Sequence, residues 1–330
     1  MAKTILVVAE HEGGKLRRGT FEALALARQL APALGAKPVA VVLGSGVGEL
    51  AAELAARGAD EAIAIDDPLL AQYTPDGYRI PLTALAAELQ PDWVLMSHTY
   101  LAQDVLPLVA AAFEAPVISD SVGASVEEGR VIYLRQPYDA KFVARTVDNG
   151  PAPRFATVQS GAVPPDDLPT GHGGTVSSRA AGVTADQLRR GSVEVHESSG
   201  KTIDLSSAEV IVAGGRGLGE KDKFEALVGG LAKAVGGAMA ASRPVVDSEW
   251  LPHEYQIGSS GQSVAPKLYF ALGISGAIQH MVGVRGAQVI VSINKDKDAP
   301  IFNESTYGIV GDVHEVVPAL IKAVEEAKKG

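Results

Sequence analysis

The sequence contains no cysteine among its 330 residues. This absence excludes disulfide bonds, cysteine-ligated zinc, iron–sulfur clusters and catalysis by a thiol. The sequence also lacks any run approaching the roughly 18 apolar residues that a membrane-spanning helix requires. The apolar run near the start, at residues 4–9, is too short for the core of a signal peptide. We therefore expect a cytoplasmic protein without membrane insertion.

The chain also has fewer basic than acidic residues. Lysine and arginine number 29 against 39 aspartates and glutamates, which gives a formal net charge of −10. Such a balance disfavours a general nucleic-acid-binding surface, so no nucleic acid is expected as a partner. Hydrophobic residues make up 46% and charged residues 21% of the chain, as in an ordinary globular α/β protein. A length of 330 residues is typical of a protein with two domains.

The first half alternates short apolar runs with helical patterns. Continuous apolar strands separated by helices are typical of a parallel sheet that is covered on both faces. After Pro116 the sequence pattern changes: β-rich segments follow one another without helical segments between them. This pattern predicts an antiparallel extension of the same domain. The expected strands are 4–10, 38–44, 59–66 and 92–98, the expected helices are 15–31, 47–58, 80–90 and 102–114, and the β-rich segments are 130–137, 140–147 and 154–161.

A second domain is predicted after a weakly patterned stretch. Residues 161–207 are rich in proline, glycine and polar side chains, and we place the connection between domains in their last part. The fold class is therefore α/β with two domains, the second doubly wound. The predicted boundaries are 1–190 for the first domain, 191–207 for the linker and 208–330 for the second domain. Expected strands of the second domain are 208–215, 238–242, 267–273, 287–294 and 307–312, with helices at 220–237, 275–283 and 315–329.

Polar or glycine-rich loops follow the strands of the second domain. Ligands of open α/β sheets bind in the crevice at the carboxyl ends of the strands, so these loops are expected to converge on one site. One extended dinucleotide would use all of them. Each feature has a plainer alternative: Arg216 as a solvated arginine in a tight turn, Arg243 as a surface arginine, and His280 as a structural histidine.

Three local expectations accompany this site. Pro244 should hold Arg243 in an extended conformation at the end of its strand. Ser275 should either cap the following helix or donate to a phosphate. Gly276, which has no Cβ, should leave room for the ligand.

The motifs together resemble the α subunit of electron transfer flavoprotein. The resemblance covers essentially the whole chain and is most specific from residue 266 to residue 312. It is carried by "RQPYDAKFVARTV", "GGRGLG", "ASRPVVD", "QIGSSG", "PKLYFALGISGAIQHMVG" and "VIVSINKDKDAPIFNESTYGIVGD". It implies FAD bound mainly by the second domain. It also implies a partner β subunit that holds AMP and docks on the first domain to give a heterodimer.

The resemblance further implies an electron carrier without substrate turnover of its own. Electrons would come from flavoprotein dehydrogenases such as the acyl-CoA dehydrogenases of fatty acid β-oxidation and would pass to a membrane quinone oxidoreductase. Two other functions stay open: a stand-alone flavin- or NAD-dependent oxidoreductase, and a nucleotide-binding regulatory module based on the first domain.

Individual roles follow from the same resemblance. Arg243 is expected against the isoalloxazine, Ser260 at flavin N5, Ser275 at the pyrophosphate and His280 at the N1–C2=O edge, where Arg243 and His280 would stabilise negative charge. The family usually has Gln-Thr-Gly where this chain has Ser259, Ser260 and Gly261. The full set of expected FAD-binding residues is Arg216, Ser242, Arg243, Gln256, Ile257, Gly258, Ser259, Ser260, Gly261, Ser275, Gly276, Gln279, His280, Asn294, Lys295 and Asp312, of which the last three would hold the adenosine.

Overall fold

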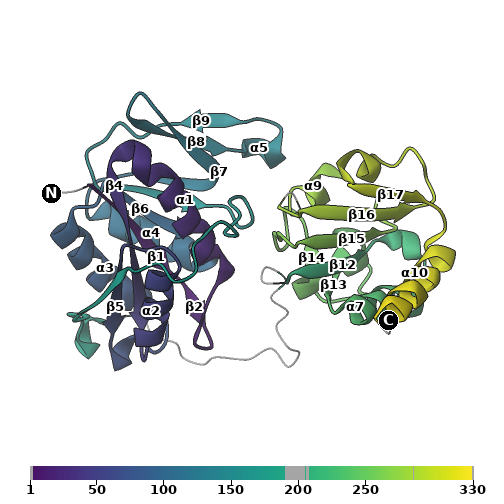
Figure 1. Cartoon of the computed structure of the whole chain (residues 1–330), viewed down its shortest axis with the longest axis horizontal. Helices are drawn as coiled ribbons and strands as arrows, with labels where there is room; N and C mark the ends of the chain where they lie inside the picture. The colour runs from purple at the N-terminus through teal and green to yellow at the C-terminus, as the bar shows by residue number, and fades with distance from the viewer. Residues whose placement is uncertain (1–2, 190–204, 206–207, 285, 329–330) are drawn as a thin grey trace. The chain divides into compact units, whose positions relative to one another are not determined.

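The computed structural model describes residues 3–189, 205, 208–284 and 286–328, in two compact units (Figure 1). Unit 1 comprises residues 1–196 and unit 2 residues 197–330. The division between them falls within the predicted linker, 191–207, which lies outside the described residues except for Leu205. Each unit has its own sheet and its own hydrophobic core.

Unit 1 is built on a sheet of nine strands in the order β11-β5-β4-β1-β6-β10-β7-β8-β9. Its strands are β1 (Lys3–Ala9), β4 (Ala36–Gly44), β5 (Glu61–Asp66), β6 (Trp93–Ser97), β7 (Val117–Glu127), β8 (Arg130–Arg135), β9 (Ala144–Thr146), β10 (Arg154–Val158) and β11 (Thr175–Arg179), beside a small hairpin of β2 (His11–Glu12) and β3 (Lys15–Leu16). Its helices are α1 (Arg18–Leu34), α2 (Gly48–Ala56), α3 (Pro75–Leu89), α4 (Tyr100–Ala111) and α5 (Pro137–Ala140), with short η1 (Pro68–Leu70) and η2 (Ala185–Gln187) turns.

The central strands of unit 1 are apolar throughout because both faces of the sheet are covered. In β1, Ile5 and Val7 pack with α1 and α2 in one core, whereas Leu6 and Val8 pack with α3 and α4 in the other. β1 pairs in parallel with β4 on one side and with β6 on the other. The predicted parallel α/β domain is therefore confirmed (Figure 1).

Some sequence expectations for unit 1 were wrong in detail. β10 was expected in the antiparallel extension, but it pairs in parallel with β6 and β7 inside the sheet, because Phe155, Ala156 and Val158 are buried like the residues of a central strand. Only β7, β8 and β9 form the antiparallel extension, and the helical turn α5 interrupts it. β11 lies in a stretch expected to be irregular; it adds to β5 through backbone pairing, and its largely exposed side chains gave no apolar pattern. Residues 15 and 16 pair in the β2–β3 hairpin and are not helical.

Unit 2 has a sheet of six parallel strands in the order β14-β13-β12-β15-β16-β17. Its strands are β12 (Val210–Gly214), β13 (Ala238–Ser242), β14 (Gln256–Ile257), β15 (Leu268–Leu272), β16 (Val289–Asn294) and β17 (Tyr307–Val310). Its helices are α6 (Lys221–Phe224), α7 (Gly230–Val235), α8 (Arg243–Val246), α9 (Ile278–Met281) and α10 (Val313–Ala327), with the π-helical turn η5 (Glu225–Gly229) and the 3-10 turns η4 (Arg216–Leu218), η6 (His253–Tyr255) and η7 (Pro300–Glu304).

The strand order of unit 2 makes it doubly wound, as predicted. The chain runs outward from β12 through β13 to β14, then returns to the other side of β12 and continues through β15 and β16 to β17. α7 and α10 lie side by side on one face of the sheet (Figure 1), and α9, η7 and their loops cover the other. The two halves part between β12 and β15, and at such a switch point a crevice opens outside the carboxyl ends of the strands.

Arg243 does not take the predicted extended conformation. The strand β13 ends at Ser242, and Arg243 is the first residue of the four-residue helix α8, with Pro244 following in the same turn. Proline is tolerated at this point because the first N–H groups of a helix have no partner within it. Among the residues that the structure describes, no helix is both long enough and apolar enough to cross a membrane.

Candidate functional site

A cavity of about 530 Å³ lies at the switch point of unit 2. It is formed by the segments that follow four strands, β12, β13, β14 and β15, and we call it the carboxyl-end cavity. Its lining consists of Gly215, Arg216, Gly217, Ser242, Arg243, Pro244, Ile257, Gly258, Ser260, Gly273, Ile274, Ser275, Ala277, Gln279 and His280. The convergence of loops that the sequence predicted is therefore present for these four strands.

The charge of this lining suits an anion. Arg216 and Arg243 contribute two guanidinium groups, and the described residues of the lining include no aspartate or glutamate. Arg243 is paired with Asp247 at 3.4 Å, but both side chains are more than half exposed, and exposed pairs of this kind are weak. The hydroxyl groups of Ser242, Ser260 and Ser275 add neutral donors. Two cations with several hydroxyls are the side-chain chemistry that binds phosphate.

The glycines of the two loops at the switch point serve close packing between backbones. A Cβ on Gly217 would lie 2.7 Å from the carbonyl oxygen of Gly273, and one on Gly215 would clash with that oxygen as well. The loop after β12 therefore rests directly on the loop after β15. This contact brings the Arg216 turn and the Ser275 loop to the same wall of the cavity.

Gly276 does not have the role expected from the sequence. A Cβ at this position would clash with the backbone of Ile301, and Gly276 does not line the cavity. Its φ of +86° also favours glycine. Ser275 does not cap the next helix either, because α9 starts after Ala277 and has no side-chain cap. Ser275 lines the cavity, and its carbonyl accepts a hydrogen bond from Ile301 N at 3.0 Å.

A tight turn at residues 256–261 forms the next wall. Gln256 is buried outside the lining, and its side-chain amide donates to both the carbonyl oxygen and Oγ of Ser260, each at 3.0 Å. Because Ser260 Oγ accepts this bond, its own proton is free to donate into the cavity. Ser259 N donates to the carbonyl of Gln279 at 2.7 Å, which ties the turn to α9.

His280 is a buried wall of the cavity, only 7% exposed. Its Nε2 lies 2.8 Å from the hydroxyl of Tyr269 and its Nδ1 lies 3.2 Å from the carbonyl oxygen of Ile257. Burial lowers the pKa of the imidazole to about 4, only partly offset by the hydrogen bond to Ile257. The ring is therefore neutral at neutral pH, contrary to a role as a fixed positive charge.

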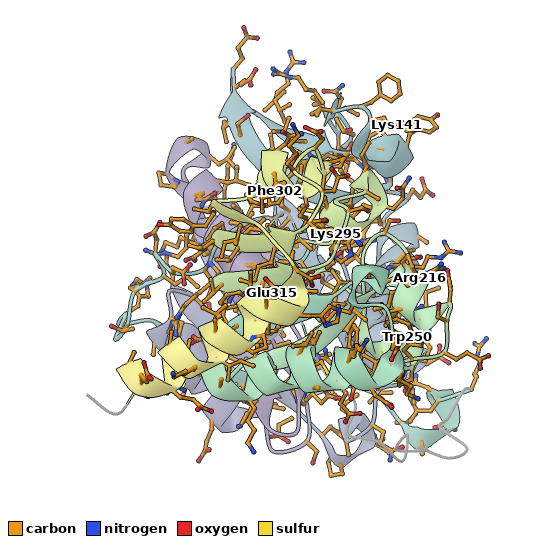
Figure 2. The ribbon with its side chains drawn as sticks, turned by 90° about the vertical axis from the view of Figure 1, so that its right-hand side faces the viewer. Lys141, Arg216, Trp250, Lys295, Phe302 and Glu315 are labelled. Carbon is orange, nitrogen blue, oxygen red and sulfur yellow. The ribbon has the colours of Figure 1, made fainter. Side chains whose placement is uncertain are left out.

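Seven of the expected FAD-binding residues lie outside this lining: Gln256, Ser259, Gly261, Gly276, Asn294, Lys295 and Asp312. Asn294 donates through Nδ2 to the carbonyl of Ile274 at 2.9 Å and so holds the loop after β15. Asp312 caps α10 by accepting from His314 N at 2.9 Å. In the view of Figure 2, Lys295, which follows β16, lies between Arg216, which follows β12, and Phe302 of η7.

Sequence reasoning missed several contributors to the site. Gly215, Gly217, Pro244, Gly273, Ile274 and Ala277 line the cavity, and the glycine-rich turns could have indicated most of them. Tyr269 was read as part of an apolar strand, yet its hydroxyl is bonded to His280. Nothing in the spacing of these two residues signals the contact, because it depends on how α9 folds back over β15.

In unit 1, the turn between β4 and α2 is occupied by the chain's own carboxylate. Asp66, at the end of β5, accepts from Gly46 N at 2.8 Å and from Val47 N at 2.9 Å, at the start of α2. Such N–H groups are where a nucleotide phosphate binds in related architectures. A phosphate at this turn would first have to displace Asp66.

Comparison with known proteins gives concordant results for both units. Residues 5–198 match the family model described as the electron transfer flavoprotein domain, and residues 204–285 match the electron transfer flavoprotein FAD-binding domain. An electron transfer flavoprotein subunit alpha of Bacillus subtilis is 38% identical over 99% of this chain and 98% of the relative. One from Thermoanaerobacterium thermosaccharolyticum is 35% identical over 99% of each chain. An acryloyl-CoA reductase electron transfer subunit beta of Anaerotignum propionicum is 32% identical over 99% of this chain and 96% of the relative.

Proposed function

The chain belongs to the electron transfer flavoprotein α-subunit family, whose members are electron carriers rather than enzymes, and on this basis we propose that it binds FAD in the carboxyl-end cavity. The observation that carries the proposal is the cavity at the switch point of unit 2, whose described lining residues include two arginines and no carboxylate. The match of residues 204–285 to an FAD-binding domain supports the same conclusion.

The residues present fit the chemical parts of FAD. Arg216 and Ser275, brought together by the contact of the two glycine loops, would hold the pyrophosphate through charge and hydrogen bonding. The backbone around Gly258 and the hydroxyl of Ser260 would meet the flavin ring, with Arg243 at the cavity wall. The bound FAD supplies the redox chemistry, and the protein supplies binding, orientation and electrostatics.

We assign the positive electrostatic contribution of the cavity to its two arginines. Added electrons bring negative charge, and guanidinium groups in a partly enclosed site stabilise such charge. The His280 ring is neutral, and both ring nitrogens have partners within the protein. Its role is to form a fixed wall of the cavity between Tyr269 and Ile257.

A β subunit is the expected partner in a heterodimer, with AMP as its nucleotide. Membership of the α-subunit family supports the partner, and the AMP remains a proposal that nucleotide analysis of the complex can test. For electron donors we propose flavoprotein dehydrogenases that act on acyl-CoA substrates, with a membrane quinone oxidoreductase as acceptor. The name of the acryloyl-CoA reductase relative supports a connection with CoA-linked redox reactions.

A stand-alone oxidoreductase fits the cavity less well. Transfer of hydrogen to or from an organic substrate generally needs a group that exchanges protons near neutral pH. The titratable side chains of the lining are two arginines and His280, and burial keeps His280 neutral.

The test is co-expression of the full chain with a β subunit of the family, followed by an absorption spectrum and mass analysis of the released nucleotides. We expect about one FAD and one AMP for each heterodimer. Arg216→Ala should weaken FAD binding roughly tenfold to a hundredfold, the range for loss of a charged hydrogen bond. Arg179→Ala, which removes an exposed arginine of unit 1, is the matched control and should leave FAD binding unchanged. A complex that is colourless and releases no flavin would overturn the proposal.

A further inference from the structure

We propose that Tyr269 is a positioning residue: its hydroxyl donates to Nε2 of His280 and holds the imidazole in one neutral tautomer, with the proton on Nδ1. Its importance for the flavin rests on the proposed function, whereas the state of the ring follows from the contacts alone. Tyr269 lies in β15, is fully buried, and does not line the cavity. It therefore acts on the cavity only through His280.

The direction of each hydrogen bond follows from the partners. The carbonyl oxygen of Ile257, 3.2 Å from Nδ1, can only accept, so Nδ1 must carry a proton. A neutral imidazole then has a lone pair on Nε2, and the phenol of Tyr269, 2.8 Å away, must be the donor. Each partner fixes one nitrogen, so the ring has one arrangement that satisfies all three groups.

A second proton on the ring would disrupt this arrangement. Nε2–H would then have to donate to the oxygen of Tyr269, whose own proton would turn away. The described residues provide no second acceptor for that hydroxyl, and burial raises the pKa of Tyr269, which keeps it a phenol. An unsatisfied buried hydroxyl is costly.

Nearby charge works in the same direction. His280 faces Tyr269 from β15 and the Ile257 carbonyl from β14, and the charged groups in the lining of the same cavity are Arg216 and Arg243. Both are basic, so neither favours an imidazolium. The consequence is a cavity wall whose charge does not change over the physiological pH range, although it contains a histidine.

The fold explains why this pair forms. In β15 alternate side chains point to opposite faces, so Tyr269 and Ala271 lie on the face that α9 and η7 cover, and Phe270 and Leu272 on the other. α9 packs on that face through Met281. His280 is thereby placed with its ring between β15 and the turn after β14, and the two centroids of the Tyr269 and His280 rings are 6.2 Å apart.

The experiment is nitrogen NMR of the histidine rings in the full chain complexed with its β subunit, with His280→Gln used to assign the signals. In the unchanged protein we expect a proton on Nδ1, a hydrogen-bonded but unprotonated Nε2, and a titration midpoint near pH 4. Tyr269→Phe keeps the ring volume and removes the donor. The neutral ring then loses its hydrogen bond at Nε2 and a protonated ring would lose its acceptor there, so the diagnostic change is in the Nε2 signal, which should move toward that of a free nitrogen.

Tyr307→Phe is the matched control, because it removes a hydroxyl from an exposed tyrosine of the same sheet; it should change neither value. A protonated Nε2 in the unchanged protein would overturn the inference. So would a Tyr269→Phe variant whose Nε2 signal matches that of the control. The flavin absorption of the same samples keeps the two hypotheses apart: a complex without FAD but with the expected ring signals would refute the proposed function and leave the tyrosine–histidine pair supported.

Discussion

The side-chain amide of Gln256 donates both of its hydrogens to Ser260, one to the carbonyl oxygen and one to Oγ, each at 3.0 Å. This pair fixes the backbone and the hydroxyl of Ser260 together. Gln256 itself is buried outside the cavity lining. The turn that forms this cavity wall is thus held by a residue outside the lining.

Gln256→Leu is expected to weaken both the fold of unit 2 and its cofactor binding. It removes two hydrogen bonds, and we expect the free energy of unfolding to fall by about 2 kcal/mol. FAD affinity should fall roughly tenfold, because the turn is less ordered before binding. Chemical denaturation and FAD titration of the complex measure the two effects.

Ser259→Ala is the control for that change and also examines the position where the family usually has glutamine. The structure connects Ser259 through its backbone N–H to Gln279, and its side chain lies outside the cavity lining. We expect a change in unfolding free energy within about 0.5 kcal/mol, the usual range for exposed substitutions. An effect of Ser259→Ala as large as that of Gln256→Leu would contradict this reading of the turn.

Gly276→Ala and Gly219→Ala form a pair with nearly equal positive φ values. Gly276 has a φ of +86° and Gly219 a φ of +85°, but only at Gly276 would a Cβ clash with neighbouring backbone, that of Ile301. Gly219 has a ψ of −54°, outside the left-handed helical region, and Gly219→Ala should cost about 2 kcal/mol for the strained backbone alone. Gly276→Ala should cost about 3 kcal/mol or more, because the loop after β15 must also move. Equal losses for the two variants, measured by denaturation, would show that the close contact is unimportant.

Glu10→Gln should stabilise unit 1 in a pH-dependent manner. Burial raises the pKa of this carboxyl above its ordinary value of 4.5, against the opposing effect of a hydrogen bond from Thr99 at 2.7 Å. The contribution of the glutamate to stability is therefore fully present below pH 4.5 and is lost as the pH rises through the higher pKa of the folded state. We expect a stabilising effect of the glutamine at pH 7.5 that is absent at pH 4, as measured by denaturation at both values. A benefit that is the same at both pH values would refute this assignment.

The sequence predicted the elements whose own residues carry the signal. Apolar alternation with helices was sufficient for β1 and β15, whose side chains are buried on both faces. It failed for β11, which joins the sheet through its backbone and leaves most of its side chains exposed. The same pattern placed β10 in the wrong part of the sheet, because an apolar sequence indicates that a strand is buried but not which strands it pairs with.

The site, like the fold, was predictable only where a local sequence pattern marks its residues. Polar loops after strands located Arg216, Ser260 and Ser275, because the geometry of a doubly wound sheet gathers such loops at one edge. Glycine is ambiguous in a sequence, since Gly276 makes room for the backbone of Ile301 and not for a ligand. The pairing of Tyr269 with His280 depends on the three-dimensional path of the chain, and no local pattern encodes it.

The carboxyl-end cavity also sets an order of events during folding. Its walls come from the ends of four strands, and one of its loops is fixed by Asn294, the last residue of β16. A nascent chain that has emerged only as far as β14 contains β12 and the two strands on one side of it, β13 and β14. It still lacks β15 on the other side of β12, and with it the loop that carries Ser275. Ile301 N also bonds the carbonyl of Ser275, so synthesis must pass residue 301 before the complete site can exist, and only the end of η7, β17 and α10 then remain to be added.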